Sequence, residues 1–376
     1  MAQKAGIALL LVALCACGRG PTQVSHSDRG AYEGSLVPIG HGFVAAWYDS
    51  RDGNAEIYMR SLDAAGRPAG AERRLTFDKA QSYEPDAISF DRDIVIAWYE
   101  REANGTLRPW VGRWSRAGER RWRTPLAAAG RNAIVRRAGE RLFCAWIDAR
   151  GRVLGAWLDA AGALTAEPFR LGDAGATTWN LNAAVDGNGV PWVVFDAKAG
   201  TRAEELFMVR ADDFGGVPIM LTANDGAASK YPDIAFNGTT PALAWYDERD
   251  GNKEVYLAAG ETLRAQAIDA AATRVTRSPG ESIGAYLTWV EGRIAVAWSE
   301  EIDRQHEVQV QLFDREAKPA TQPQRVTRTA ARSLIPAIKP WGRNLALAWN
   351  EYTPGDSSGH GDTGSRSEIS FTVVRP

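Results

Sequence analysis

Acidic residues that recur beside tryptophan are the first candidates for chemistry in this 376-residue sequence. The pattern apolar-x-apolar-Ala-Trp-x-acidic places a carboxylate two positions after the tryptophan in six segments, at Asp49, Glu100, Asp148, Asp247, Glu300 and Glu351. If these segments assemble side by side, the carboxylates would form a ring that could collect a cation or a basic ligand. The alternative is structural, because an aspartate beside a turn usually hydrogen-bonds the backbone of that turn.

Two of these acids lie in nearly identical stretches, AWYDSRDGNAEIYM at 46–59 and AWYDERDGNKEVYL at 244–257. An arginine follows each acid two positions later, where it could pair with the carboxylate. Side chains two apart on a strand share one side, so each tyrosine between tryptophan and acid faces the other way. The candidate binding face therefore consists of Tyr48, Asp49, Arg51, Glu100, Asp148, Tyr246, Asp247, Arg249, Glu300 and Glu351.

A repeated structural unit must position these residues, and the sequence contains one. The aromatic positions of the pattern are Trp47, Trp98, Trp146, Phe195, Trp245, Trp298 and Trp349, at steps of 51, 48, 49, 50, 53 and 51 residues. Each unit holds further short apolar runs separated by turn pairs such as Asp-Gly, which predicts four antiparallel strands, named a to d in chain order, with the tryptophan on b. Seven such units predict an all-β, seven-bladed β-propeller. If the weaker fourth unit, WVVFDA, is misread, the count becomes six or eight.

The last unit predicts how the ring closes. Its strands a, b and c are expected near 335–340, 344–350 and 367–374, after which the sequence ends without a strand d. Gln23-Val24-Ser25 precedes the first unit and has the form of a strand d. We therefore expect the N-terminal segment to complete the last blade and to cover its exposed edge. The predicted propeller domain spans residues 22–376.

The segments AVDGNG, AWYDxRDGNxEIY and RLT together resemble the sialidase-like, BNR-repeat propellers of secreted bacterial proteins, from about Thr22 to the end. This resemblance implies the propeller fold, and Asp-boxes are present only in degraded form, as at Ser61-Leu62-Asp63. It also implies a Phe/Tyr-Arg-Ile-Pro motif, whose arginine holds the substrate carboxylate in sialidases. The corresponding residues here are Ser35-Leu36-Val37-Pro38, so the proline matches and the arginine is absent. We therefore do not expect sialidase activity.

The N-terminus has the layout of a bacterial lipoprotein signal. Residues 1–16 contain one lysine and an apolar run that is too short to cross a membrane, and Leu14-Cys15-Ala16-Cys17 resembles a lipobox. The resemblance implies lipidation at Cys17, with residues 17–21 as a tether; the alternative is an ordinary signal peptide with a chance cysteine. Gly18 is not the aspartate that often retains such proteins at the inner membrane, so we expect an outer-membrane lipoprotein on the periplasmic side or at the cell surface.

This anchor would orient the propeller. Only about five residues separate Cys17 from the closing strand, a reach of roughly 20 Å. The face that carries the c–d turns would then lie toward the bilayer, and the acidic face would lie away from it. Arg116, Arg120 and Arg121 fall in one of these turns and could contact lipid or lipopolysaccharide phosphates, although a merely solvated edge is the alternative.

The remaining chemistry-bearing residues do not form a recognisable signature. Asp356, His360 and Asp362 lie in a Gly/Ser-rich stretch without fixed ligand spacing, and Cys144 lies in an apolar run as a buried residue would. No nucleophile, zinc or phosphate-loop motif occurs, so we expect no metal and no cofactor. The formal net charge of −2 argues against nucleic acid as a partner.

These features predict a non-catalytic binding or scaffold module for a glycan or a protein partner. The alternative is a carbohydrate-active hydrolase or lyase that uses acids of the same face. Two carboxylates across the channel mouth, one with a raised pKa, would favour the alternative.

Overall fold

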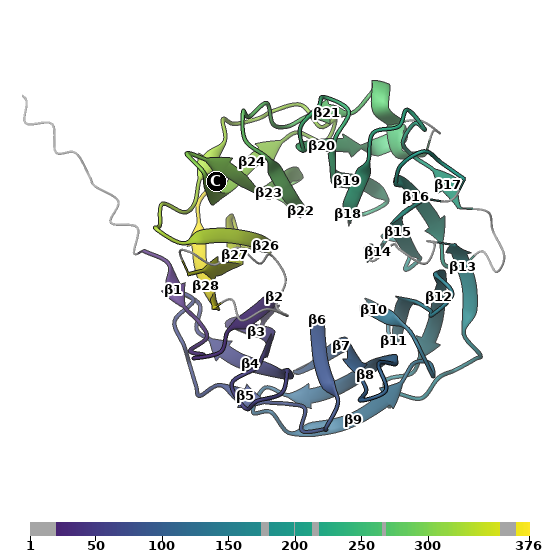
Figure 1. Cartoon of the computed structure of the whole chain (residues 1–376), viewed down its shortest axis with the longest axis vertical. Helices are drawn as coiled ribbons and strands as arrows, with labels where there is room; N and C mark the ends of the chain where they lie inside the picture. The colour runs from purple at the N-terminus through teal and green to yellow at the C-terminus, as the bar shows by residue number, and fades with distance from the viewer. Residues whose placement is uncertain (1–19, 174–179, 199, 213–217, 265–267, 354–365) are drawn as a thin grey trace, which may run out of the picture.

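The computed structural model describes residues 20–376 except 174–179, 199, 213–217, 265–267 and 354–365. These residues form seven four-stranded antiparallel sheets, which are arranged as blades around a centre (Figure 1). The predicted seven-bladed propeller is confirmed, including the weak fourth unit. Strand a of each blade lies innermost in Figure 1, and strand d lies at the rim.

The first four blades follow the chain in order. The first contains β2 (Ala31–Ile39), β3 (Gly42–Asp49), β4 (Glu56–Leu62) and β5 (Arg73–Arg74). The second contains β6 (Gln81–Phe90), β7 (Asp93–Arg101), β8 (Leu107–Ser115) and β9 (Arg120–Pro125). The third contains β10 (Arg131–Ala138), β11 (Arg141–Ile147), β12 (Arg152–Leu158) and β13 (Phe169–Asp173). The fourth contains β14 (Leu181–Val185), β15 (Pro191–Ala197), β16 (Glu205–Arg210) and β17 (Ile219–Met220).

The last three blades complete the ring. The fifth contains β18 (Ser229–Asn237), β19 (Thr240–Asp247), β20 (Glu254–Ala259) and β21 (Thr273–Arg274), with the short 3₁₀ helices η1 (Gly260–Arg264) and η2 (Ile268–Ala270) before β21. The sixth contains β22 (Ser282–Val290), β23 (Arg293–Ile302), β24 (Gln305–Phe313) and β25 (Gln324–Arg325). The seventh contains β26 (Arg332–Trp341), β27 (Asn344–Tyr352), β28 (Ser367–Val374) and, from the N-terminus, β1 (Thr22–Gln23). No helix in the described part of the chain is long and apolar enough to cross a membrane.

The predicted closure of the ring is also confirmed. Strand β1 pairs antiparallel with β28, with Thr22 opposite Phe371 and Gln23 opposite Ser370. The paired residues begin one position earlier than expected, but Val24 extends the ladder by donating its backbone N–H to Ile369 O at 2.7 Å. The outer edge of the last blade is therefore covered by the beginning of the chain.

The aromatic residues of the repeat form the packing layer between blades. The six tryptophans on the b strands and Phe195 are all fully buried, with no more than 1% of each exposed. Trp47 belongs to a cluster that also contains Ala346, Ile369 and Phe371, so the first blade packs on the seventh. Removing such a ring from a core costs about 3–5 kcal/mol, which explains why the aromatic position is kept in every blade.

Strand a carries a bulge in six of the blades. The register shifts next to residues with positive φ, which are Glu33, Glu84, Asn132, Tyr231, Gly284 and Ile335. Side chains rarely adopt this backbone region, and such residues gather at functional sites. Because strand a lies innermost, the bulges place these residues beside the centre of the ring.

Candidate functional site

The b–c hairpins and the d–a loops form one face of the propeller, as expected. In the first blade, the hairpin residue Asn54 donates from Nδ2 to Asp78 O at 3.0 Å and to Ala80 O at 2.9 Å, and both acceptors lie in the loop between β5 and β6. Asn252 makes the same contacts in the fifth blade, to Ser278 O and Gly280 O. Each twin hairpin is thus fixed to the loop that leads into the next blade.

The acids that follow tryptophan are buried within their own hairpins. Asp49 accepts hydrogen bonds from Trp47 Nε1 at 3.2 Å and from the backbone N–H of Arg51 at 2.9 Å, and it pairs with the Arg51 guanidinium. Ser27 donates to the same carboxylate at 2.8 Å. Both carboxylate oxygens of Asp49 are therefore used within the first blade and the loop before it. This is the structural role expected of an aspartate beside a turn.

Asp247 has matching partners in the fifth blade. It accepts from Trp245 Nε1 at 3.0 Å, from Ser229 Oγ at 2.7 Å and from the backbone N–H of Arg249 at 2.9 Å. Burial opposes ionisation, but the hydrogen bonds from Arg249, Ser229 and Trp245 outweigh it and lower the pKa of Asp247. Arg249 also pairs with Asp269 of η2, just as Arg51 pairs with Glu72 in the first blade.

The other predicted acids are also held by neighbouring groups, with a different set of partners in each blade. Glu100 accepts from Trp98 Nε1 at 3.1 Å and pairs with Arg123 at 2.7 Å, yet burial raises its pKa. Glu300 accepts from Trp298 Nε1 at 3.2 Å. Glu351 accepts from Ser333 Oγ at 2.8 Å, and burial raises its pKa as well. Asp148 caps its own turn through Arg150 and Arg152.

The tyrosines of the candidate face point to the opposite side of the b strands. Tyr48 stacks on Tyr32 with ring centroids 5.2 Å apart and meets the edge of Tyr83 at 5.1 Å. Tyr246 stacks on Tyr231 at 5.5 Å. Burial raises the pKa of Tyr48 and of Tyr246. The predicted residues are thus split between two surfaces of each blade: the acids pack with tryptophan, and the tyrosines pack toward the neighbouring strand a.

A second set of acids begins strand c and was missed from the sequence. In four blades a glutamate there accepts a hydrogen bond from a threonine at the end of strand d, in the pairs Glu56–Thr76, Glu205–Thr222, Glu254–Thr276 and Glu307–Thr327. An arginine pairs with the same glutamate in three of them, as Arg74 does with Glu56 at 2.7 Å. The sequence indicates these pairs only indirectly: EIY is followed by RLT in the first blade, and EVY is followed by RVT in the fifth.

The fourth blade lacks this arginine, since Met220 occupies the corresponding position. Burial raises the pKa of Glu205 to about 7, and the hydrogen bond from Thr222 offsets this only in part. Glu205 Oε1 is buried and has no hydrogen-bond partner among the described residues. This carboxylate is therefore the least well compensated member of the set.

Glu84 is a titratable residue beside the centre of the ring that was not among the predicted site residues. It occupies the left-handed bulge of β6 and accepts from Tyr99 OH at 3.2 Å. Burial raises the pKa of Glu84 to about 7, although Tyr99 and the positive charge of Arg131 both oppose the shift. The signal was a Ser-x-x-Pro motif that recurs on strand a with an acid in the second blade only. The copies that span a bulge are Ser82-Tyr83-Glu84-Pro85, Ser229-Lys230-Tyr231-Pro232 and Ser333-Leu334-Ile335-Pro336.

Histidine and cysteine form no metal site in the described residues, where no three His, Cys, Asp or Glu residues cluster suitably. His26 contacts Glu72 at 3.1 Å, and burial lowers the pKa of His306. Asp356, His360 and Asp362 lie outside the described residues, as do Cys17 and the rest of the predicted signal segment. Cys144 is a buried free thiol whose pKa is raised by burial.

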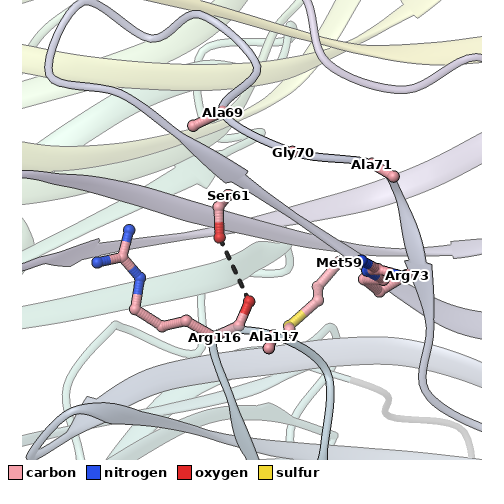
Figure 2. A pocket seen from close by; sticks show the side chains of 8 residues that line it. All are labelled: Met59, Ser61, Ala69, Gly70, Ala71, Arg73, Arg116 and Ala117. Atoms are coloured by element: carbon pink, nitrogen blue, oxygen red, sulfur yellow. Dashed lines mark hydrogen bonds between the residues drawn. The ribbon is translucent and has the colours of Figure 1, made fainter.

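Two depressions lie at the seam between the first and second blades. One, of about 200 Å³, lies near the c–d turns, between the first blade and Arg116 and Ala117 of the next. The first-blade residues that line it are Met59, Ser61, Ala69, Gly70, Ala71 and Arg73. Figure 2 shows the Ser61 hydroxyl directed at the backbone oxygen of Arg116, at 3.5 Å. The other, of about 350 Å³, lies on the face of the b–c hairpins.

No protein-family model matches the chain, and no curated protein sequence does. Solved structures do match. A puromycin-hydrolyzing peptidase of Mycobacterium tuberculosis is 13% identical with a TM-score of 0.55, over 91% of this chain and 54% of that one. A mutant of puromycin hydrolase complexed with PGG is 13% identical with a TM-score of 0.53, over 86% of this chain and 52% of that one.

A mutant of Trypanosoma rangeli sialidase displaying trans-sialidase activity is also similar. It is 10% identical with a TM-score of 0.48, over 95% of this chain and 57% of that one. The chain spans about half the length of these structures. At such identities the similarity establishes the fold alone. The chain is a seven-bladed β-propeller.

Proposed function

We propose that this chain is an exported propeller, anchored to the outer membrane through lipidated Cys17, that binds a glycan or protein partner without transforming it. The face of the b–c hairpins and d–a loops would make the contact. The observation that carries this proposal is the state of the acids that follow tryptophan. Asp49 and Asp247 are fully hydrogen-bonded inside their hairpins, so they hold the loops in place and leave the loop surface to a ligand.

The direction of the closing strand supports an orientation relative to a membrane. Because β1 runs antiparallel to β28, it begins at the face of the c–d turns and runs toward the face of the b–c hairpins. An anchor a few residues before Thr22 would hold the c–d face near the bilayer. This arrangement would leave the b–c face open to a partner.

The c–d face carries charge that suits phosphate. Arg116 and Arg120 are exposed. Within the described residues, Arg121 makes only ion pairs of 3.5 Å, with Asp93 and Glu119. Arg73 and Arg116 border the smaller depression, and neither forms an ion pair with any residue that the structure describes. Headgroup phosphates of an anionic membrane would complement these guanidinium groups.

A carbohydrate-active enzyme is the second candidate, and Glu84 is the observation that favours it. Burial keeps this carboxyl partly protonated near neutral pH, as a general acid requires, and its bulge places it beside the centre of the ring. If the chain were a hydrolase, Glu84→Gln would abolish sugar release while leaving glycan binding intact.

A glycan-array screen of the purified chain tests the two candidates together, with each bound glycan also assayed for released sugar. The proposed function predicts binding without release, and Glu84→Gln then leaves the binding pattern unchanged. Release of sugar that is lost in Glu84→Gln would overturn it and establish the enzyme. If no glycan binds, the partner is a protein, which cross-linking in intact cells would capture at the hairpin loops.

A further inference from the structure

The depression on the b–c face is built by two blades and one loop. One wall consists of first-blade hairpin residues, and the other consists of second-blade residues. The first-blade residues are Ser50, Gly53, Asn54 and Ala55, and the second-blade residues are Gln81, Tyr83 and Arg101. Arg29, from the loop that leads into β2, closes one end. A Cβ atom built on Gly53 would lie 4.0 Å from Arg29 Nη1, so the loop and the hairpin meet at this edge.

The charge of this depression differs from that of the whole chain. Among the residues that the structure describes, its lining includes two exposed arginines, Arg29 and Arg101, and no aspartate or glutamate. The chain as a whole has a formal net charge of −2. Among the residues that the structure describes, the Arg29 guanidinium forms no ion pair. A concave surface with two guanidinium groups and no carboxylate favours a ligand that carries negative charge.

The repeat supplies an internal comparison. The fifth blade has nearly the same hairpin, and Asn252 fixes it to the next loop as Asn54 does in the first. The surrounding residues differ, however. Gln81 and Arg101 are paired across β6 and β7, and the equivalent positions at the fifth–sixth seam are Glu281 and Glu301.

The loop position equivalent to Arg29 is Ala227, as the pairing of Ala31 with Asp49 and of Ser229 with Asp247 shows. The fifth–sixth seam is therefore acidic, and Lys253 pairs there with Glu281 at 3.1 Å. Since the two hairpins are nearly identical, the blade can form without these two arginines at its seam with the next blade. The basic character of the first–second seam is a local departure from the repeat, as expected of a site.

Gln81 is the neutral residue of the depression that presents a hydrogen-bond donor. Tyr83 OH donates to Gln81 Oε1 at 2.5 Å, which leaves the amide nitrogen of Gln81 as its donor group. The Arg101 guanidinium carbon lies 5.8 Å from the centroid of the Tyr83 ring. Guanidinium and amide N–H groups around one hollow match the acceptor oxygens of a carboxylate or phosphate. The volume of about 350 Å³ is at the lower end for small-molecule sites.

We propose that the seam between the first and second blades binds an oxyanion group, a carboxylate or a phosphate, on a molecule the size of a sugar. Arg29 and Arg101 are the residues that recognise the charge. This proposal rests on the proposed function, because it names the ligand class of the same face.

The test is a titration of the purified full chain in a non-ionic detergent with glucuronic acid, glucose 6-phosphate and glucose, followed by ligand-observed NMR. We expect one or both anions to bind and glucose not to bind, and the preferred anion distinguishes carboxylate from phosphate. Binding should weaken with added salt. Arg29→Ala and Arg101→Glu, the latter copying the fifth–sixth seam, should each weaken binding at least about tenfold, since each removes a charge-assisted hydrogen bond. Arg92→Glu, on an a–b turn of the opposite face, is the matched control and should change nothing.

Three outcomes would overturn the site: no saturable binding of either anion, equal binding of glucose, or anion binding that survives both arginine substitutions. Failure of the site and failure of the proposed function are distinguishable. A neutral glycan bound equally by the wild type and Arg101→Glu would retain the binding module and reject the oxyanion site. Sugar release together with arginine-dependent anion binding would retain the site and reject the non-catalytic function.

Discussion

Ser25 occupies in the last blade the place that Thr76 occupies in the first. Its hydroxyl donates to Glu368 Oε2 at 2.5 Å and accepts from the backbone N–H of Ile369 at 2.8 Å. Thr76 bonds to Glu56 and to the N–H of Ile57 in the same way. The N-terminal segment therefore closes the ring with the side-chain contacts of a strand d as well as with its backbone. Gln23 and Val24 correspond in turn to Arg74 and Leu75.

Replacing Ser25 tests this closure. We expect Ser25→Ala to lower the free energy of unfolding by about 1–3 kcal/mol, because it leaves the N–H of Ile369 without its acceptor. Among the described residues, it also removes one of the two hydrogen bonds to the half-buried Glu368 carboxylate, which keeps only the backbone N–H of Ser27. Ser25→Thr restores the hydroxyl of the other blades and should retain most of the stability. Chemical denaturation of the two variants makes the comparison. Equal stability of Ser25→Ala and the wild type would show that backbone pairing alone closes the ring.

Glu205 predicts an unusual pH dependence of stability. Its pKa in the folded chain is raised to about 7, above the unfolded value near 4.5, because its carboxylate is buried without an arginine. Its contribution is therefore most favourable below pH 4.5 and is lost as the pH rises to 7. Glu205→Gln keeps an acceptor for Thr222 and removes the charge, so it should stabilise the chain at pH 8 by about 1–3 kcal/mol. The gain should shrink toward pH 5.

Glu254→Gln is the matched control for that measurement. Glu254 bonds to Thr276 as Glu205 does to Thr222, but it also pairs with Arg274 at 3.1 Å. Its substitution should therefore destabilise the chain at pH 8. Thermal unfolding of both variants and the wild type at pH 5 and pH 8 gives the change in stability that each substitution causes at each pH. A loss of stability in Glu205→Gln at pH 8 would contradict the account of uncompensated burial.

Asp247 should behave in the opposite direction. Its pKa is lowered in the folded chain, so it contributes stability above the unfolded value near 3.8 and loses it as the pH falls through the folded value. We expect Asp247→Asn to destabilise the chain by about 1–3 kcal/mol at pH 7, because Arg249, Ser229 and Trp245 lose a charged acceptor. The difference from the wild type should decrease toward pH 3. A difference that does not change with pH would rule out the charge as its source.

The fold could be predicted from the sequence because the residues that repeat from blade to blade are those that must be buried. Trp47 and its counterparts recur about every fifty residues, and the turn pairs between them bound strands of the right length. The pairing of Glu56 with Thr76 was not predicted, because it depends on the register of strand c against strand d. Thr76 was noted as part of an RLT ending, and Glu56 as part of EIY, but nothing in the spacing joined them.

The seam site was beyond sequence reasoning for a related reason. Arg29 comes from the loop that precedes the first blade, whereas Gln81 and Arg101 come from β6 and β7 of the second. Only the packing of these blades brings the three residues around one depression. The two fourteen-residue stretches at 46–59 and 244–257 are nearly identical, so comparing them reveals no difference between the first and fifth blades. The difference that matters lies in the next blade, at Glu281 and Glu301 where the second blade has Gln81 and Arg101.

The charge of the c–d face leads to the last prediction. In a Cys17→Ser background, which removes the predicted lipid, we expect the chain to bind vesicles that contain phosphatidylglycerol. Substituting Glu for Arg116, Arg120 and Arg121 together should weaken this binding at least about a hundredfold, since each basic residue near an anionic surface contributes about 1 kcal/mol. The control makes the same change of net charge on the b–c face, at the exposed Arg277, Arg304 and Arg328. Co-sedimentation compares the two triple variants. If the c–d face lies toward the bilayer, only the c–d triple variant should lose vesicle binding. Equal losses in the two variants would show an effect of net charge alone. Unchanged binding in the c–d variant would place this face away from the bilayer.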